Sequence, residues 1–178
     1  MKYQLNIQSR RRTAMSKKKN EIVEDSYSLP MVRVQLVMEP VSDFTSRDPI
    51  TTPEDAVNAV AEYLQKVDRE YLVAIFIATD GHLICAQVVS IGTLNYSAIS
   101  GRELYKAAVL SNCSSVILLH NHPSGNLTPS DEDIKVTRDL EKGGRLLGIQ
   151  LLDHIIVAGG CAGQLYSFLR NGKMSESC

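Results

Sequence analysis

The chain has 178 residues, 44% of them hydrophobic, and a formal net charge of −1, which is enough to bury the core of one domain of ordinary size. It has no apolar stretch long enough to span a membrane and no secretory signal, so we expect a cytoplasmic protein without a membrane partner. The cysteines are widely scattered and include no Cys-x-x-Cys pair, which favours reduced thiols over disulfides or a second metal site. They are Cys85, Cys113, Cys161 and Cys178.

The basic residues are concentrated at the start of the chain. The first twenty residues carry +7 and no acidic residue, which leaves −8 for the remainder. Such an arm could contact DNA by releasing counterions from phosphate. A basic run is weak evidence, however, and the alternatives are a solvated flexible tail or translated sequence ahead of a start at Met15. The basic residues are Lys2, Arg10, Arg11, Arg12, Lys17, Lys18 and Lys19.

The first predicted elements are an edge strand and a helix. Hydrophobic and polar residues alternate at 31–37, as expected for an edge strand. Thr52 and Pro53 then indicate a helix start, as cap and first helical residue, and the helix continues to about Lys66. Its expected buried residues are Val57, Val60, Ala61 and Leu64.

A hairpin and an alternation of helices and strands follow. The apolar runs 71–78 and 83–91 flank Asp80-Gly81, which is typical of a hairpin turn, and His82 beside it is expected to be exposed and inert. The remaining predicted elements are a helix at 101–111, a strand at 115–119, a helix from Asp133 to about Leu147 that ends at Gly143-Gly144 or Gly148, and a strand at 151–157. Residues 166–169 are expected to close the fold.

The most informative motif is a pair of histidines followed by a carboxylate. His120 and His122 follow the predicted strand 115–119, and Asp133 lies eleven residues after His122. Because side chains alternate along a strand, the two imidazoles point the same way if the strand persists. Three protein ligands leave a position for water, as in a catalytic zinc site. Cys113 is close in sequence but is better explained as a small buried residue at a helix–strand junction.

The second half of the motif predicts a helix start. Thr128 and Pro129 suit the N-cap and the first helical position, which places Asp131 third and puts Ser130 and Asp133 on one helical face. The alternative is that Ser130 is the N-cap and Asp133 its capping-box partner. Taken with the two histidines, the metal interpretation is the stronger one.

These residues carry a resemblance. His-x-His-Pro with Ser130 and Asp133 at this spacing resembles the JAMM signature of JAB/MPN-domain metalloproteins, and the string His-Asn-His-Pro-Ser-Gly resembles the bacterial RadC branch. The similarity covers about residues 50–170 and implies an α/β fold of the α+β type, a cytidine-deaminase-like MPN/JAB fold whose mixed, mostly antiparallel sheet is flanked by helices. Further matching segments are 89–94, 101–104 and 152–157.

We also expect the following domain organisation, in which the resemblance implies the segment 50–170 and the charge and hydrophobic patterns indicate the others. Residues 1–28 form a basic arm, 29–49 an edge strand and linker, 50–170 the RadC-like JAB/MPN domain, and 171–178 a C-terminal tail. Proteins of this branch often carry an N-terminal helix-hairpin-helix region, and these 178 residues leave no room for it.

For the site, the resemblance implies one Zn²⁺ per chain, held by His120, His122 and Asp133, with Ser130 as the donor that stabilises an oxyanion. A glutamate upstream would act as general base. Glu70 is chosen because it directly precedes the first strand of the domain, as the family order requires. Glu103 is the alternative, but it lies on an amphipathic helix where a glutamate usually faces solvent.

The implied activity is zinc-dependent hydrolysis of a peptide or isopeptide bond in a protein substrate. Asn121 stands where the wider family usually has serine or threonine, an asparagine that the RadC branch shares, and Asp153-His154 is expected to have a structural role. Two other functions stay open: a DNA-repair or DNA-transaction accessory protein that uses the basic arm, and a non-catalytic MPN scaffold, against which the complete ligand set argues. A homo-oligomer is also left open.

Overall fold

The computed structural model describes residues 36–38, 48–64, 69–92, 101–158 and 164–174. The basic arm and the extreme C-terminus lie outside these residues, and so does most of the predicted edge strand. Leu36 and Val37, the end of that prediction, are not in a strand. Within the described ranges, no helix combines the length and the apolar character that crossing a bilayer requires.

One five-stranded sheet, in the order β2-β1-β3-β4-β5, forms the centre of the domain. Only β3 and β4 are parallel, and the other three pairs are antiparallel. This mixed, mostly antiparallel sheet with helices confirms the predicted fold class. The strands are β1 Tyr71–Ile77, β2 Leu83–Ile91, β3 Ser115–His122, β4 Gln150–Ala158 and β5 Leu165–Ser167.

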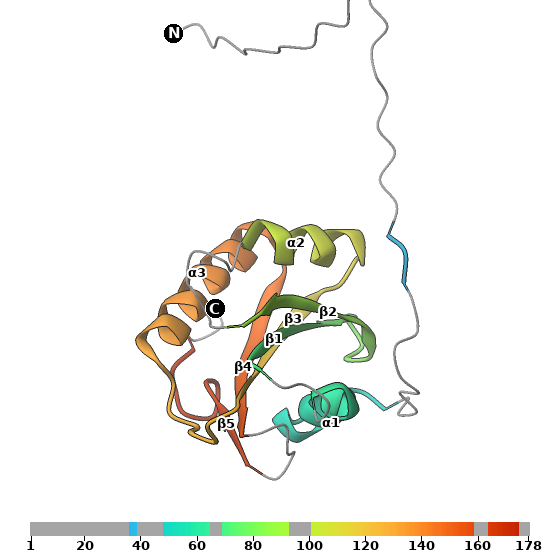
Figure 1. Ribbon diagram of the computed structural model, residues 1–178. Helices are drawn as coiled ribbons and strands as arrows, with labels where there is room; N and C mark the ends of the chain where they lie inside the picture. Colours follow the sequence, from blue (N-terminus) through green and yellow to red (C-terminus); the bar gives the residue numbers. More distant parts are fainter. Residues whose placement is uncertain (1–35, 39–47, 65–68, 93–100, 159–163, 175–178) are drawn as a thin grey trace, which may run out of the picture. The chain divides into compact units, whose positions relative to one another are not determined.

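Helices cover both faces of the sheet. Figure 1 shows α2 and α3 on one face and α1 on the other, and each face has its own apolar cluster. Because β1 and β3 are central, nearly all of their residues are buried on both faces, which explains their continuous apolar runs. The helices are α1 Pro53–Leu64, α2 Gly101–Leu110 and α3 Asp131–Leu147.

Several local predictions are confirmed. The Thr52 hydroxyl accepts a hydrogen bond from the Asp55 N–H at 3.1 Å, as expected of the cap of α1. The hairpin turns at Gly81, whose φ of 86° suits glycine. The helix α3 ends at Gly148 rather than at the earlier glycine pair, with Gly148 in the left-handed conformation at φ 68°.

The predicted start of α3 is wrong. The helix begins at Asp131 with Ser130 as its N-cap, not at Thr128 and Pro129. Ser130 and Asp133 form a reciprocal capping box that satisfies the N–H groups of both residues. Thr128 instead donates its N–H to the side chain of Asn126 in the preceding loop. The cap with the better reciprocal partner therefore determines where the helix begins.

The chain path positions the site. The segment β3–α3–β4 is a crossover between parallel strands, so the chain leaves the carboxyl end of β3 and enters the amino end of α3 through one loop. The start of β1 lies at the same end of the sheet, because β1 runs antiparallel to β3 and Leu72 pairs with His120.

Candidate metal centre

The carboxyl end of β3 brings the two histidines together. The strand persists to His122, so both imidazoles project from the same face, and their Nε2 atoms lie 2.8 Å apart. His120 is fully buried, whereas His122 is partly exposed. The geometry agrees with the alternation expected for a strand that continues through the motif.

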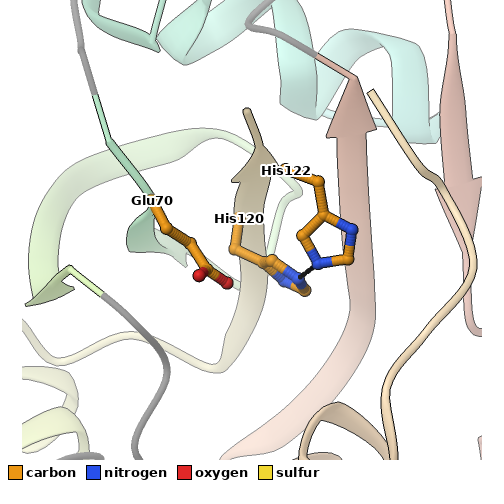
Figure 2. A group of neighbouring side chains, drawn as sticks. All are labelled: Glu70, His120 and His122. Atoms are coloured by element: carbon orange, nitrogen blue, oxygen red, sulfur yellow. Dashed lines mark hydrogen bonds between the residues drawn. The ribbon is translucent and has the colours of Figure 1, made fainter. Parts of the chain in front are cut away.

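Glu70 completes a close group with the histidines. Figure 2 shows its carboxylate beside the two imidazoles, and candidate ligand atoms of Glu70, His120 and His122 all lie within 4.8 Å of one another. Glu103, the alternative base, lies on α2, where its half-exposed side chain pairs with Lys106. Glu70 is therefore the glutamate at the histidines, close enough to be a metal ligand as well as a base.

The two carboxylate oxygens of Asp133 have different environments. Its Oδ2 accepts hydrogen bonds from the N–H and the hydroxyl of Ser130, at 2.8 and 2.7 Å. Its Oδ1 is buried and has no hydrogen-bond partner among the residues that the structure describes. The same Oδ1 lies 3.4 Å from the Nε2 of His120. Capping and metal binding, which the sequence presented as alternatives, are thus both available to this residue.

The Ser130 hydroxyl is both a donor and an acceptor of hydrogen bonds with Asp133. Its hydroxyl donates to Oδ2 of Asp133 and accepts from the N–H of the same residue at 3.1 Å. The hydroxyl therefore lies at the site, but its hydrogen points to the carboxylate. Its predicted role as an oxyanion donor stays a prediction and requires that hydrogen to turn away from Asp133.

The contact of His122 with a carbonyl shows which ring nitrogen donates a hydrogen bond. Its Nδ1 makes a short hydrogen bond to the backbone oxygen of Asn126. A carbonyl oxygen can only accept, so Nδ1 carries the hydrogen. In the neutral imidazole the other nitrogen, Nε2, is then without a hydrogen and presents its lone pair to the site.

A buried chain of hydrogen bonds sets the same tautomer in His120. The Thr137 hydroxyl donates to the Asp133 carbonyl at 2.7 Å, so its oxygen accepts from Nδ1 of His154 at 2.6 Å. The Nε2 of neutral His154 is then an acceptor for Nδ1–H of His120, 2.8 Å away. His120 is therefore also left with a bare Nε2.

Burial keeps this chain neutral. Desolvation lowers the pKa of His120 to about 4, against an opposing effect of the Asp133 charge and with a smaller contribution from His122. Desolvation also lowers the pKa of His154 well below its usual value. When both imidazoles are in these neutral tautomers, their Nε2 lone pairs face each other across the 2.8 Å that separates the two atoms.

This arrangement fits a divalent cation. In these neutral tautomers, two imidazole lone pairs converge with the Asp133 oxygen that has no hydrogen-bond partner in the described part of the chain, and such acceptors repel one another unless a positive charge lies between them. Imidazole nitrogen and carboxylate oxygen are ligands that Zn²⁺ commonly takes in proteins. The residues present therefore fit the metal that the sequence motif predicts, with His120, His122 and Asp133 or Glu70 as donors.

Comparison with known proteins agrees with this fold and motif. Residues 50–173 match the RadC-like JAB domain family. The chain belongs to this family. The UPF0758 protein ABC2615 of Shouchella clausii is 48% identical over 115 residues, which is 65% of this chain and 50% of that protein.

Two further relatives support the same assignment. A UPF0758 protein of Desulfitobacterium hafniense is 44% identical over 116 residues, 65% of this chain and 51% of the relative. A UPF0758 protein of Methanosarcina mazei is 41% identical over 111 residues, which is 62% of this chain and 48% of the relative. This RadC-like JAB domain protein thus spans about half the length of the curated relatives it matches.

The site of this RadC-like domain opens on one side. A hollow of about 490 Å³ is bounded by Glu70, His122 and Ser130 together with the loop that joins β3 to α3. His120 and Asp133 lie beneath, nearly or fully buried. A substrate that enters this hollow would meet Glu70 and the exposed edge of His122. The full set of lining residues is Glu70, His122, Pro123, Ser124, Asn126, Thr128, Pro129, Ser130 and Glu132.

Two residues of the RadC-like site were missed by sequence reasoning. His154 was expected to be structural together with Asp153, and Thr137 was not considered. Asp153 does have a structural position, but His154 contacts His120 directly. The available signal was positional, since Thr137 lies one helical turn after Asp133 and therefore on the same face.

The structure of this RadC-like domain describes two of the cysteines, Cys85 and Cys113. Cys113 is buried in the apolar cluster beneath α2, as expected for a small core residue, and burial raises the pKa of its thiol. Cys85 is also a free thiol, while Cys161 and Cys178 lie outside the described residues. His82 is exposed, as expected, and its Nδ1 lies 3.1 Å from Oδ1 of Asp80 in the hairpin turn.

Proposed function

We propose that this protein is a zinc-dependent hydrolase that cleaves an amide bond, either peptide or isopeptide. The observation that carries the proposal is the convergence of the Nε2 atoms of His120 and His122, 2.8 Å apart, beside a buried Asp133 oxygen that has no hydrogen-bond partner among the described residues. Zn²⁺ supplies two things when bound: it lowers the pKa of a bound water and it polarises a carbonyl.

Asp133 is the third ligand in this proposal, and Glu70 is the general base. Asp133 is nearly fully buried, and its Oδ1 has no hydrogen-bond partner among the described residues, so a cation would satisfy a group that is otherwise costly to bury. Glu70 instead lines the open hollow, where water and substrate can reach its carboxylate. A base needs that access, whereas a ligand does not.

In this proposal, two side chains around the hollow act in proton transfer and in stabilising the oxyanion. Glu70 takes the proton of the attacking water and returns it to the leaving amine. Ser130, whose hydroxyl lies at the rim, donates a hydrogen bond to the oxyanion of the tetrahedral intermediate. The loop residues that line the hollow contact the substrate on either side of the scissile bond.

The test is an assay of the zinc-loaded protein against sets of peptide and isopeptide substrates. We expect turnover by the unaltered protein and a loss of at least about a hundred-fold in Glu70→Gln, since general bases contribute on that scale. Glu103→Gln is the matched control and should retain full activity. Equal activity of the Glu70→Gln and Glu103→Gln variants would contradict the assigned base.

A further inference from the structure

We propose that Asn121 is a positioning residue that holds Glu70 against the metal centre. The residue lies between the two histidines in the sequence of β3, and it is almost completely buried. Its Oδ1 accepts a hydrogen bond from the N–H of Tyr71 at 2.8 Å, and its Nδ2 donates to the carbonyl of Arg69 at 2.9 Å. The inference rests on the proposed function, in which Glu70 is the base.

One side-chain amide thus binds the backbone on both sides of Glu70. The Arg69 carbonyl belongs to the peptide group before Glu70, and the Tyr71 N–H belongs to the peptide group after it. The orientation of the Asn121 amide is unambiguous, because the carbonyl can only accept and the N–H can only donate. Both peptide planes that flank the Glu70 Cα are therefore held.

The two hydrogen bonds of the Asn121 amide, called the clamp below, extend the contact between β1 and β3 beyond their last backbone pair. Pairing between β1 and β3 ends at Leu72 and His120, and the Asn121 amide supplies the next donor and acceptor in place of backbone. On the other side, the Glu70 carbonyl accepts from the N–H of Gly92 at 2.8 Å. Glu70 is thus held from both neighbouring strands while its side chain reaches the histidines, as Figure 2 shows.

Few side chains can replace this amide. Asn carries a donor and an acceptor on two separate atoms, which the two peptide groups require. Aspartate would accept from Tyr71 but would set a second oxygen against the Arg69 carbonyl. Alanine would leave the Tyr71 N–H and the Arg69 carbonyl without the partners that they have here.

The first experiment is a double-mutant cycle on zinc affinity. Zn²⁺ dissociation constants are measured by chelator competition for the unaltered protein, Glu70→Gln, Asn121→Ala and the double variant. We expect Glu70→Gln to weaken binding about ten-fold, the scale of an outer-shell partner. Asn121→Ala should weaken binding about five-fold when Glu70 is present and less than about two-fold when it is absent, because coupled residues are not additive.

The second experiment needs no metal. Amide hydrogen exchange of the metal-free protein should show a protected Tyr71 N–H that exchanges at least about ten-fold faster in Asn121→Ala, with the Leu72 amide unchanged. Leu118→Ala, which removes apolar volume from the same strand, is the control for a general loss of stability. Asn121→Ser keeps a small polar group and replaces the alanine variant if that variant does not fold.

The outcomes distinguish a failure of the inference about Asn121 from a failure of the proposed function. Equal effects of Asn121→Ala on zinc affinity with and without Glu70 would overturn the inference, and so would a Tyr71 amide that exchanges as fast in the unaltered protein as in the variant. Absence of zinc binding by the unaltered protein overturns the proposed function instead. The exchange of the Tyr71 amide still decides in that case whether Asn121 holds Glu70.

Discussion

Two regions of the molecule each bury an aspartate, and they treat its carboxylate differently. In the region where β4 meets β5, Asp153 accepts from the N–H groups of His154 and Leu169 at 2.8 and 2.9 Å and from the Ser167 hydroxyl. Both of its oxygens are used. At the start of α3, Asp133 has one oxygen in the capping box and one to which none of the described residues donates a hydrogen bond.

The difference distinguishes a structural carboxylate from a functional one. A buried acceptor without a hydrogen bond costs free energy, so a protein retains one only where something else satisfies it. Asp153 is satisfied by the fold itself and stabilises the β4–β5 connection. Asp133 is satisfied only in part, and it faces the histidines. The two regions should therefore respond in opposite ways to equivalent substitutions.

The largest expected effect is on metal binding. Asp133→Asn should weaken Zn²⁺ binding about a thousand-fold, more than the ten- to hundred-fold typical of residues outside the ligand set. Asp153→Asn is the matched control and should bind zinc within about two-fold of the unaltered protein. Chelator competition measures both. Similar affinities of the two variants would remove the distinction between the aspartates.

The second effect is on the free energy of unfolding, where the substitution of Asp153 should have a larger effect than that of Asp133. Asp153→Ala removes the acceptor of three donors and should lower the free energy of unfolding by about 3 kcal/mol, at ~1 kcal/mol or more for each buried group. Asp133→Ala loses the capping box and should cost about 1 kcal/mol in metal-free protein. Urea denaturation measures both, and a greater loss at Asp133 than at Asp153 would contradict the comparison.

The third effect concerns the chain of hydrogen bonds behind His120. Thr137→Val keeps the shape of the side chain but removes the hydroxyl that orients His154, so His120 is no longer held with a bare Nε2. Zinc affinity should fall about ten-fold. Nitrogen-15 NMR of the histidines in the metal-free protein should show Nδ1–H in His120 of the unaltered chain. The opposite tautomer there would refute the assignment.

The smallest effect is a pH dependence of stability. Desolvation by burial raises the pKa of Asp153 above 3.8, although the Ser167 hydroxyl opposes it. Between the unfolded and the folded pKa, the folded state keeps a proton that the unfolded state has lost. The free energy of unfolding should therefore fall as pH rises through that window, relative to Asp153→Asn. Denaturation at a series of acidic pH values would show the sign, and a rise would be contrary to it.

The fold was largely predictable because its signals are local. The apolar runs of the central strands, the Thr52 cap and the turn at Gly81 each act over a few residues, and the structure agrees with them. The start of α3 was not, because Thr128 and Ser130 both suit an N-cap. Only the reciprocal bond from Asp133 decides between them.

The residues of the metal motif were predictable from the sequence, but the contacts that hold them in position were not. Histidines two apart on a strand share a face, which follows from strand geometry alone. The contacts of His154 with His120, and of Asn121 with the backbone of Arg69 and Tyr71, join residues 34 and about 50 positions apart. Such contacts depend on the order and register of the strands, which no local pattern contains.

The central claim is that His120, His122 and Asp133 form a zinc site, and metal analysis of the purified protein tests it most directly. We predict one Zn²⁺ per chain at neutral pH in the unaltered protein and in Asp153→Asn, and none in Asp133→Ala or His122→Ala. An unaltered protein that binds no stoichiometric zinc, or an Asp133→Ala variant that retains a full equivalent, would contradict the account.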